Sequence, residues 1–186
     1  GVTDGLTTFI ATDNSLTCIE VNADDVAYAT ENWTSADGDI DEGVTFSDNC
    51  VVQGNPDYTY VPNDNFEQAL VDLGHDDVLD NYVLTENINN LNSLNVSSRS
   101  ISDLTGIEDF NALESLNCSY NELESLALSS AAPMTGYLYC TGNQLTELDL
   151  SIYTNLQTLS VANNLLTTLD VSQNIALNTL LCGGNQ

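Results

Sequence analysis

Leucine residues in the second half of the chain recur at a fixed spacing. The motif Leu-x-x-Leu-x-Val/Cys begins at Leu91 and is repeated, in whole or in part, five times. Its second leucines are separated by 22, 22, 21 and 21 residues; they are Leu94, Leu116, Leu138, Leu159 and Leu180. In four repeats an asparagine follows three residues after the motif, at Asn121, Asn143, Asn164 and Asn185. A second leucine motif then begins at Leu123, Leu145 and Leu166.

This pattern predicts a leucine-rich-repeat fold, which has a period of about 20 to 29 residues and these leucine spacings. Each repeat would place one short parallel strand about 4.8 Å from the preceding one, with its leucines turned inward. The asparagine side chain would pair with backbone groups that are otherwise buried without a partner. We therefore expect residues 91–186 to form an α/β-type repeat solenoid of 21–22-residue repeats, with mostly short parallel strands and loops, truncated at its C-terminal end.

The first half of the chain contains one more copy of the motif. Residues 1–50 begin with Leu6-x-x-Phe9-x-Ala11-x-x-Asn14. We interpret them as the last repeat and the C-terminal cap of an upstream leucine-rich-repeat array. Residues 51–62 contain glycine, asparagine and proline residues that disfavour regular structure, and are predicted to be a linker.

A short helix is predicted between the linker and the repeats. Asp64 and Glu67 have the spacing of a capping box, apolar residues fall on one helix face, and Gly74 would end the helix. The ends of a repeat array need shielding elements. Residues 63–90 are therefore interpreted as the helical N-terminal cap of the array.

Three stretches of the sequence resemble one family of proteins. They are Tyr60 to Leu70 (YVPNDNFEQAL), Ile101 to Phe110 (ISDLTGIEDF), and the Leu-x-Cys-x-x-Asn-x-Leu repeats. They are similar to secreted leucine-rich-repeat proteins of marine-type bacteria, whose repeats are internalin-like. The resemblance implies an extracellular or cell-surface location and a role in adhesion or partner recognition. The chain departs from the pattern at Met134 to Tyr137, where a repeat lacks its first leucine.

The charge balance restricts the partners that the chain can bind. It contains 28 acidic residues, no lysine and a single arginine, Arg99, so its net charge is -27. Nucleic acid is excluded as a partner because almost nothing here could neutralise phosphates. No apolar run is long enough to cross a bilayer, so direct membrane insertion is not expected. The acidic surface is consistent both with cation binding and with simple solubility in saline water.

The five cysteines fall into two groups. Cys118, Cys140 and Cys182 occupy the inward repeat position that Val96 and Val161 also fill, so they are predicted to be reduced core residues. Cys18 and Cys50 bracket the proposed C-terminal cap of the upstream array, and a disulfide between them is predicted for a secreted protein. There is no Cys-x-x-Cys pair to indicate a metal cluster.

Calcium is the one ion that the sequence suggests, and no other cofactor is expected. Asp37, Asp39 and Asp41 alternate along a loop, and Asp48 follows at the end of this segment. Alternating carboxylates of this kind converge on one ion in calcium loops. Glu42 stands where such loops carry glycine and Asp48 where they carry glutamate, so a solvated acidic loop remains the alternative.

The outward positions of the repeat strands are the candidate binding face. Side chains alternate along a strand, so residues between the inward leucines point to the outer surface. These candidates are Ser115, Asn117, Tyr137, Tyr139, Thr158 and Ser160. The two tyrosines provide a large contact area with a polar tip. The alternative is that they only cover the irregular repeat.

These features predict a non-enzymatic binding module. The sequence contains one histidine and no recognisable nucleophile–base arrangement, so no catalytic residues are assigned. We expect adhesion or partner binding, with a protein, a glycan or neighbouring copies of the chain as ligand. A structural role in a stalk, filament or sheath is the first alternative. A carbohydrate-active enzyme is the second, because the 28 acidic residues are numerous enough to include a pair of catalytic carboxylates.

Overall fold

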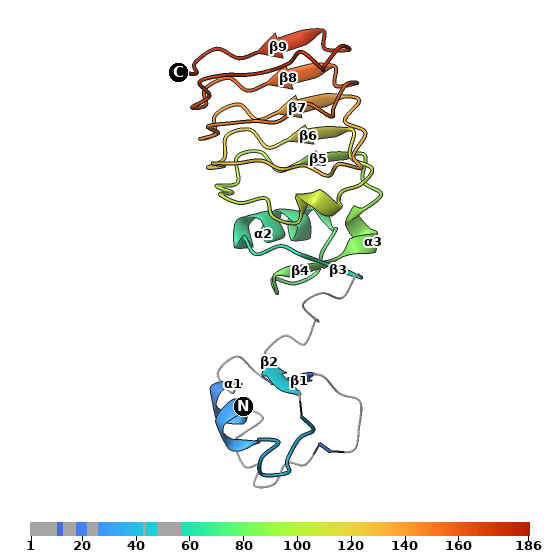
Figure 1. The fold of residues 1–186 in the computed structure, drawn as a ribbon, viewed down its shortest axis with the longest axis vertical. Helices are drawn as coiled ribbons and strands as arrows, with labels where there is room; N and C mark the ends of the chain where they lie inside the picture. The colour runs from blue at the N-terminus through green and yellow to red at the C-terminus, as the bar shows by residue number, and fades with distance from the viewer. Residues whose placement is uncertain (1–10, 13–17, 22–25, 43, 48–56) are drawn as a thin grey trace. The chain divides into compact units, whose positions relative to one another are not determined.

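The structure is a computed structural model that describes residues 11–12, 18–21, 26–42, 44–47 and 57–186. The chain forms two compact units, Gly1–Asn55 and Pro56–Gln186. Figure 1 shows the elements of both units, and each unit is considered by itself below.

The first unit contains a helix between two parallel strands. Strand β1 (Cys18–Glu20) pairs in parallel with β2 (Thr45–Ser47), and helix α1 (Val26–Asn32) lies between them in sequence. The buried side chains of the described part are Val21, Ala29, Trp33, Ile40, Val44 and Phe46. The rings of Trp33 and Phe46 lie 5.7 Å apart at their centres. The sequence pattern did not predict this helix, and the assignment of the segment to the end of an upstream array stays a prediction.

The second unit begins with a cap made of a hairpin and two helices. Strand β3 (Tyr58–Tyr60) pairs antiparallel with β4 (Tyr82–Leu84), and the helices are α2 (Asp64–Leu73) and α3 (Thr85–Ile88). The predicted linker 51–62 is wrong for its last residues, because Thr59 and Val61 are buried in this cap. Strand β3 has only three residues, which is too short for alternation to be recognised in the sequence, and the nearby Pro62 favoured the interpretation as a linker.

Helix α2 matches the prediction at its C-terminal end but not at its start. Its N-cap is Asn63, whose side chain accepts a hydrogen bond from the backbone N–H of Phe66 at 3.0 Å. Gly74 ends the helix with φ of 78°, a left-handed conformation that favours glycine. The predicted capping box at Asp64 and Glu67 is not formed. Asn63 is the N-cap, and the Glu67 side chain is buried, where it accepts hydrogen bonds from backbone N–H groups of the segment 80–82.

Glu67 holds the loop that follows α2. Its side chain is 1% exposed, and Oε1 accepts hydrogen bonds from the backbone N–H groups of Asp80 at 2.8 Å and Tyr82 at 3.1 Å. Burial is the largest influence on its pKa and raises it above the ordinary value, and the charges of Asp76 and Asp80 act in the same direction. A buried carboxylate therefore ties the helix to the β3–β4 hairpin.

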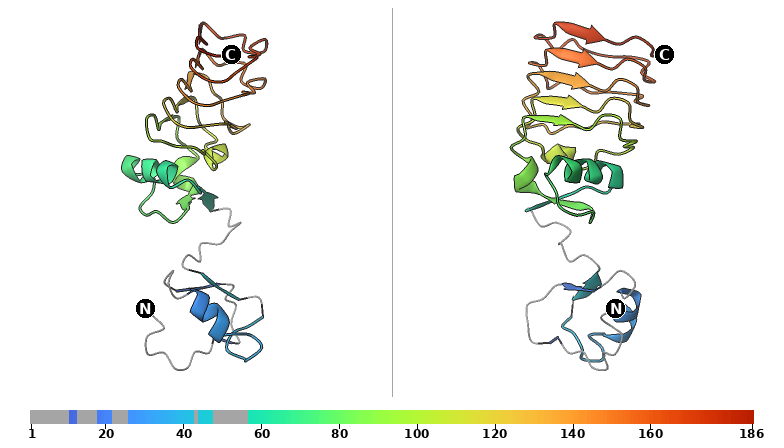
Figure 2. Two further views of the ribbon diagram at one scale, coloured as in Figure 1. Left: turned by 90° about the vertical axis from the view of Figure 1, so that its left-hand side faces the viewer. Right: turned by 180° about the vertical axis from the view of Figure 1, so that it is seen from behind.

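The repeats form a five-stranded parallel sheet with one strand per repeat. The strands are β5 (Ser93–Asn95), β6 (Ser115–Asn117), β7 (Tyr137–Tyr139), β8 (Thr158–Ser160) and β9 (Thr179–Leu181). Their order in the sheet follows the sequence, and the right-hand view in Figure 2 shows them side by side. A 3-10 helix, η2 (Ile107–Asp109), lies between β5 and β6.

The predicted leucine ladder is confirmed by the register of the sheet. Leu94, Leu116, Leu138, Leu159 and Leu180 are successive partners across the five strands. The first four are at most 2% exposed, whereas Leu180 on the last strand is 41% exposed. The second leucine motifs pack against the same core, with Leu123, Leu145 and Leu166 buried.

The buried asparagines connect each repeat to the one before it. Asn143 Nδ2 donates to the carbonyl oxygens of Cys118 and Cys140, both at 3.0 Å, while its Oδ1 accepts from the N–H of Leu123 at 3.1 Å. Asn121, Asn164 and Asn185 make the equivalent bonds, each to its own repeat and to the preceding one. This confirms the predicted role of the asparagine, and shows that each amide satisfies backbone groups of two repeats at once.

Replacement of one ladder asparagine should destabilise the repeat unit. Asn143→Ala would leave the N–H of Leu123 buried without a partner and remove one of the two amide donors from each of the Cys118 and Cys140 carbonyl oxygens, which keep their bonds to Asn121 and Asn164. We therefore expect a loss of about 2 kcal/mol in unfolding free energy. Gln144→Ala is the matched control, because Gln144 is exposed and its side chain makes one long bond of 3.4 Å. Urea unfolding followed by circular dichroism measures both. Equal losses in the two variants would contradict the proposed role of the amide.

Glu67 should make stability depend on pH. Because its pKa is raised in the folded state, the folded protein binds more protons than the unfolded chain just above the ordinary value of 4.5. Its contribution to stability is therefore present at lower pH and is lost as pH rises through the folded pKa. In Glu67→Gln this contribution is absent, and Gln can still accept the two backbone bonds.

Urea unfolding of both proteins at a series of pH values from 4 upward measures the effect, with the pH steps chosen to bracket the ordinary carboxyl pKa. We expect the wild-type stability, relative to the variant, to improve as pH falls. A constant difference across the series would show that Glu67 has the same pKa in both states.

Candidate binding face

The strand face brings the six predicted residues into two neighbouring columns. Asn117, Tyr139 and Ser160 are paired across β6, β7 and β8, and Tyr137 is paired with Thr158. Ser115 opens β6 next to them, and its Oγ accepts a hydrogen bond from the N–H of Tyr137 at 3.3 Å. The alternation of inward and outward residues therefore places the candidates on one continuous surface.

Two tyrosines form the centre of this face. The rings of Tyr137 and Tyr139 are stacked, with centroids 4.4 Å apart and planes inclined by 21°. Both side chains are half-buried, and the Tyr137 hydroxyl lies 3.4 Å from Ser93 Oγ on β5. Because each ring supports the other, the pair is an ordered aromatic surface rather than two independent side chains.

Ser160 is not available for contact with a ligand. It is 7% exposed, and its Oγ lies 2.6 Å from Thr141 Oγ1, so it bonds within the protein. Its prediction as a face residue is wrong because alternation gives the direction of a side chain but not what covers it. Asn117 and Thr158 remain half-exposed beside the tyrosines.

Tyr120 is a surface aromatic that the sequence pattern missed. It is 65% exposed and has φ of 57°, a conformation rare for tyrosine. The same position of the other repeats holds Ser98, Gly142, Asn163 and Gly184, all with positive φ. A Cβ on Gly142 would lie 2.8 Å from Cδ1 of the Tyr120 ring, so this glycine makes room for it. A tyrosine in a column of small residues was the signal available in the sequence.

The repeat cysteines line the interior of the sheet. Cys118 and Cys140 are fully buried, and the Cys118 thiol donates to the carbonyl oxygen of Tyr139 at 3.4 Å. The hydrogen bond with Cys118 and burial raise the pKa of the Cys140 thiol well above its ordinary value. Cys182 is free as predicted but exposed, which corrects the expectation that all three are buried.

The other predicted pair of cysteines lies in the first unit. Cys18 is in β1 and is disulfide-bonded. Cys50 lies outside the described residues, so its pairing with Cys18 stays a prediction.

Two of the predicted calcium ligands make hydrogen bonds within the described part of the first unit. Asp37 Oδ2 accepts a hydrogen bond from Thr34 Oγ1 at 2.7 Å, and Asp39 Oδ2 lies 3.4 Å from the backbone N of Thr34. Within the described ranges, no group of three or more histidine, cysteine or acidic side chains could hold a metal ion. Asp48 lies outside those ranges, so a calcium site completed by it stays a prediction.

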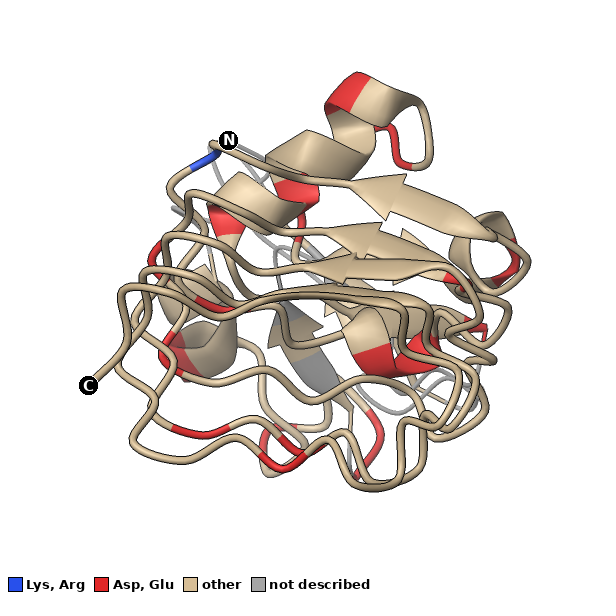
Figure 3. Cartoon of the chain, turned by 90° about the horizontal axis from the view of Figure 1, so that it is seen from above, with Lys and Arg blue, Asp and Glu red and all other residues tan. Residues whose placement is uncertain are grey.

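The single basic residue is already paired. Figure 3 shows one basic position among many acidic ones. It is Arg99, whose guanidinium forms an ion pair with Asp72 of α2 and lowers the pKa of that carboxyl. Among the described residues no helix is long and apolar enough to cross a membrane.

Two solved structures of proteins from Listeria monocytogenes are similar to this chain. One is described as the functional domain of InlJ, which includes a cysteine ladder; it is 35% identical, has a TM-score of 0.62, and the match covers 69% of this chain and 29% of that one. The other is an internalin, InlF, at 21% identity and a TM-score of 0.55, covering 67% of this chain and 37% of that one. No family model and no curated protein matches the sequence. The repeat region therefore has an internalin-like leucine-rich-repeat fold, and the chain spans about a third of the length of these neighbours.

The three repeat cysteines should differ in reactivity. In the folded protein a thiol reagent should modify Cys182 rapidly, while Cys118 and Cys140 stay protected by burial and by the raised pKa of Cys140. Denaturation without reductant should then expose three thiols if Cys18 and Cys50 are bonded. Mass spectrometry of the labelled chain gives the counts. Rapid labelling of Cys118 in the folded protein, or five reactive thiols after denaturation, would contradict this assignment.

Proposed function

We propose that the chain is a non-enzymatic, extracellular binding module of a bacterial surface protein, and that it holds a protein partner against the strand face. The observation that carries the proposal is the stacked pair of Tyr137 and Tyr139 on an outward surface of the sheet. The likeness to internalins, which are leucine-rich-repeat proteins, supports a protein-binding or adhesive role in general.

The geometry of the face suits recognition by contact. The parallel strands are tied to one another by backbone hydrogen bonds and by the asparagine ladder, so the outward side chains sit on a rigid support. Tyrosine buries a large area at low entropic cost and keeps a hydroxyl for hydrogen bonding, which is why it is enriched in interfaces. Asn117 and Thr158 add polar groups at the edges of the pair.

A protein ligand fits the tyrosine pair better than a glycan does. A sugar ring packs against the open face of an aromatic ring, and stacking covers one face of each tyrosine. The outer edges and hydroxyls of the pair remain, and these suit side chains and backbone groups of a polypeptide. A glycan is therefore the second ligand class to be tested.

A structural role is the second candidate function, and one observation favours it. The last described strand, β9, exposes Leu180 and Leu181, and Ile175 is 86% exposed nearby in sequence. Apolar side chains exposed on the last strand of an array are suited to packing against a further repeat unit, whether of the same protein or of another copy.

Loss of the tyrosine pair should abolish partner binding without unfolding the protein. The labelled chain is applied to a protein array and a glycan array, and its signals are compared with those of Tyr137→Ala plus Tyr139→Ala. We expect protein signals that fall at least about tenfold in this variant, as for aromatic residues at the centre of an interface. Tyr60→Ala plus Tyr82→Ala is the matched control, because it removes a second tyrosine pair, 5.3 Å apart in the cap.

Sedimentation velocity distinguishes partner binding at the strand face from the structural role. Binding at the strand face predicts a monomer over a wide concentration range, whereas a filament component should assemble as its concentration rises. Protein signals unchanged by the tyrosine substitutions would refute the proposed face. Concentration-dependent assembly without any array signal would favour the structural role.

A further inference from the structure

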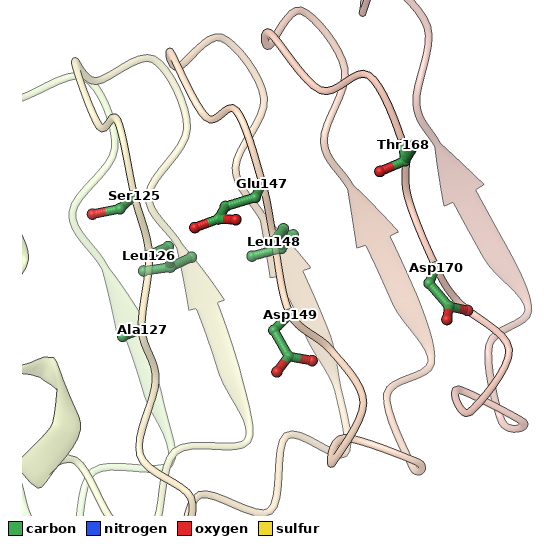
Figure 4. A pocket seen from close by; sticks show the side chains of 8 residues that line it. All are labelled: Ser125, Leu126, Ala127, Glu147, Leu148, Asp149, Thr168 and Asp170. Atoms are coloured by element: carbon green, nitrogen blue, oxygen red, sulfur yellow. The ribbon is translucent and has the colours of Figure 1, made fainter.

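A groove crosses the repeats away from the strands, along the second leucine motif. It has a volume of about 570 Å³ and is lined by parts of three successive repeats: residues 125–127, residues 147–149, and Thr168 with Asp170. Figure 4 shows these side chains on neighbouring segments of the array. None of its lining residues belongs to the strand face described above.

The groove combines apolar and acidic side chains. Leu126 and Leu148 pack against the core but are only half-buried, unlike the leucines of the first four strands, which are buried. Glu147, Asp149 and Asp170 are exposed around them, and the lining contains no basic residue. The only arginine of the chain is occupied by Asp72 in the cap. The negative charge of the groove is therefore not compensated by a basic side chain of the chain.

The two aspartates are held in place and charged. Oδ1 of Asp149 accepts the N–H of Ser151 at 2.9 Å, and Oδ1 of Asp170 accepts the N–H of Ser172 at 2.8 Å. These bonds lower the pKa of both carboxyls, whereas the charge of Asp170 acts to raise that of Asp149. The second effect is the repulsion of two neighbouring carboxylates, which a cation between them would relieve.

The groove continues into the preceding repeat. A smaller hollow shares residues 125–127 with it and is lined on its other side by Asp103 and Glu108, with Leu104 and Ile107 beneath. The acidic and apolar character thus extends along the array rather than converging on one point. Within the described ranges no set of acidic side chains has the arrangement needed to hold a metal ion. An elongated ligand suits this shape better than a single ion.

We propose that this groove is a second binding site, which takes an extended polypeptide segment rich in lysine or arginine. The aliphatic stem of a lysine or arginine would lie over Leu126 and Leu148, and its charged end would reach the carboxylates at the sides. Long cationic side chains commonly cover apolar surface in this way while the head group stays at the edge. The site is independent of the strand face and goes beyond the function proposed above.

The proposal has two parts, a charge contact with the carboxylates and a contact of the aliphatic stem with the leucines. Binding of three short peptides of equal length to the full chain tests both. One carries lysines, the second carries acetylated lysines, and the third carries diaminopropionate, which has the same charge on a shorter stem. Fluorescence anisotropy at physiological salt measures their affinities. We expect the lysine peptide to bind, the acetylated peptide not to bind, and the short-stem peptide to bind several-fold more weakly.

Matched variants locate the binding. Glu147→Gln plus Asp149→Asn should weaken the lysine peptide about fivefold to tenfold, on the order expected for two exposed charge pairs. Glu114→Gln plus Glu122→Gln removes the same charge from exposed positions outside the groove and should change the affinity less than about twofold. Asn can still accept the Ser151 bond, and Glu147→Gln alone keeps the test informative if the double variant melts early.

Several outcomes would overturn the proposal. Equal weakening by the groove and control variants would mean that only overall charge attracts the peptide. Equal affinity for the short-stem peptide would show that the leucines make no contact. Loss of binding in Tyr137→Ala plus Tyr139→Ala would place the peptide on the strand face instead.

Discussion

The repeat unit depends on the hydrogen bonds of a buried amide. A parallel strand of three residues contributes few backbone bonds, and the chain must turn sharply after each strand to reach the next part of the repeat. The turn leaves carbonyl and N–H groups facing the interior, where water cannot reach them. One asparagine per repeat satisfies groups of its own repeat and of the preceding one. No other side chain of this size carries two hydrogen-bond donors and an acceptor on one planar group. The asparagine position of each repeat therefore tolerates few other residue types.

The same constraint explains the need for a cap. The first strand of the array, β5, has no preceding repeat from which to receive bonds, so its core would be open to solvent. The β3–β4 hairpin and α2 close it with buried apolar residues, among them Val61, Phe66 and Leu70. The buried Glu67 joins the helix to the hairpin through backbone N–H groups rather than through a basic side chain. A chain with a single arginine builds its internal electrostatic contacts largely from carboxylates and backbone dipoles.

The charge balance also separates two kinds of surface on the array. The strand face is aromatic and mostly uncharged, with Tyr137 and Tyr139 stacked at its centre. The groove along the second leucine motif is acidic, with half-exposed leucines between the carboxylates. A repeat fold presents both surfaces at once. Equivalent residues of successive repeats line up along the array, and the strand residues and the second-motif residues line up on different surfaces. Different partners could therefore occupy the two surfaces independently.

Periodicity in the sequence determined the repeat register, the inward leucines and the role of the asparagines, because each of these depends on local spacing alone. It also determined helix α2 and its glycine end, which follow from local capping chemistry.

Only the tertiary structure decided what covers each side chain. Ser160 and Tyr137 both alternate with core leucines, yet Thr141 covers the first and leaves it 7% exposed. The ring of Tyr120 fits against the next repeat because Gly142 has no side chain there. The groove likewise arises from residues 21 or 22 positions apart, brought together by stacking of the repeats. Burial and clustering of this kind are properties of neighbours in space, and a one-dimensional pattern does not contain them.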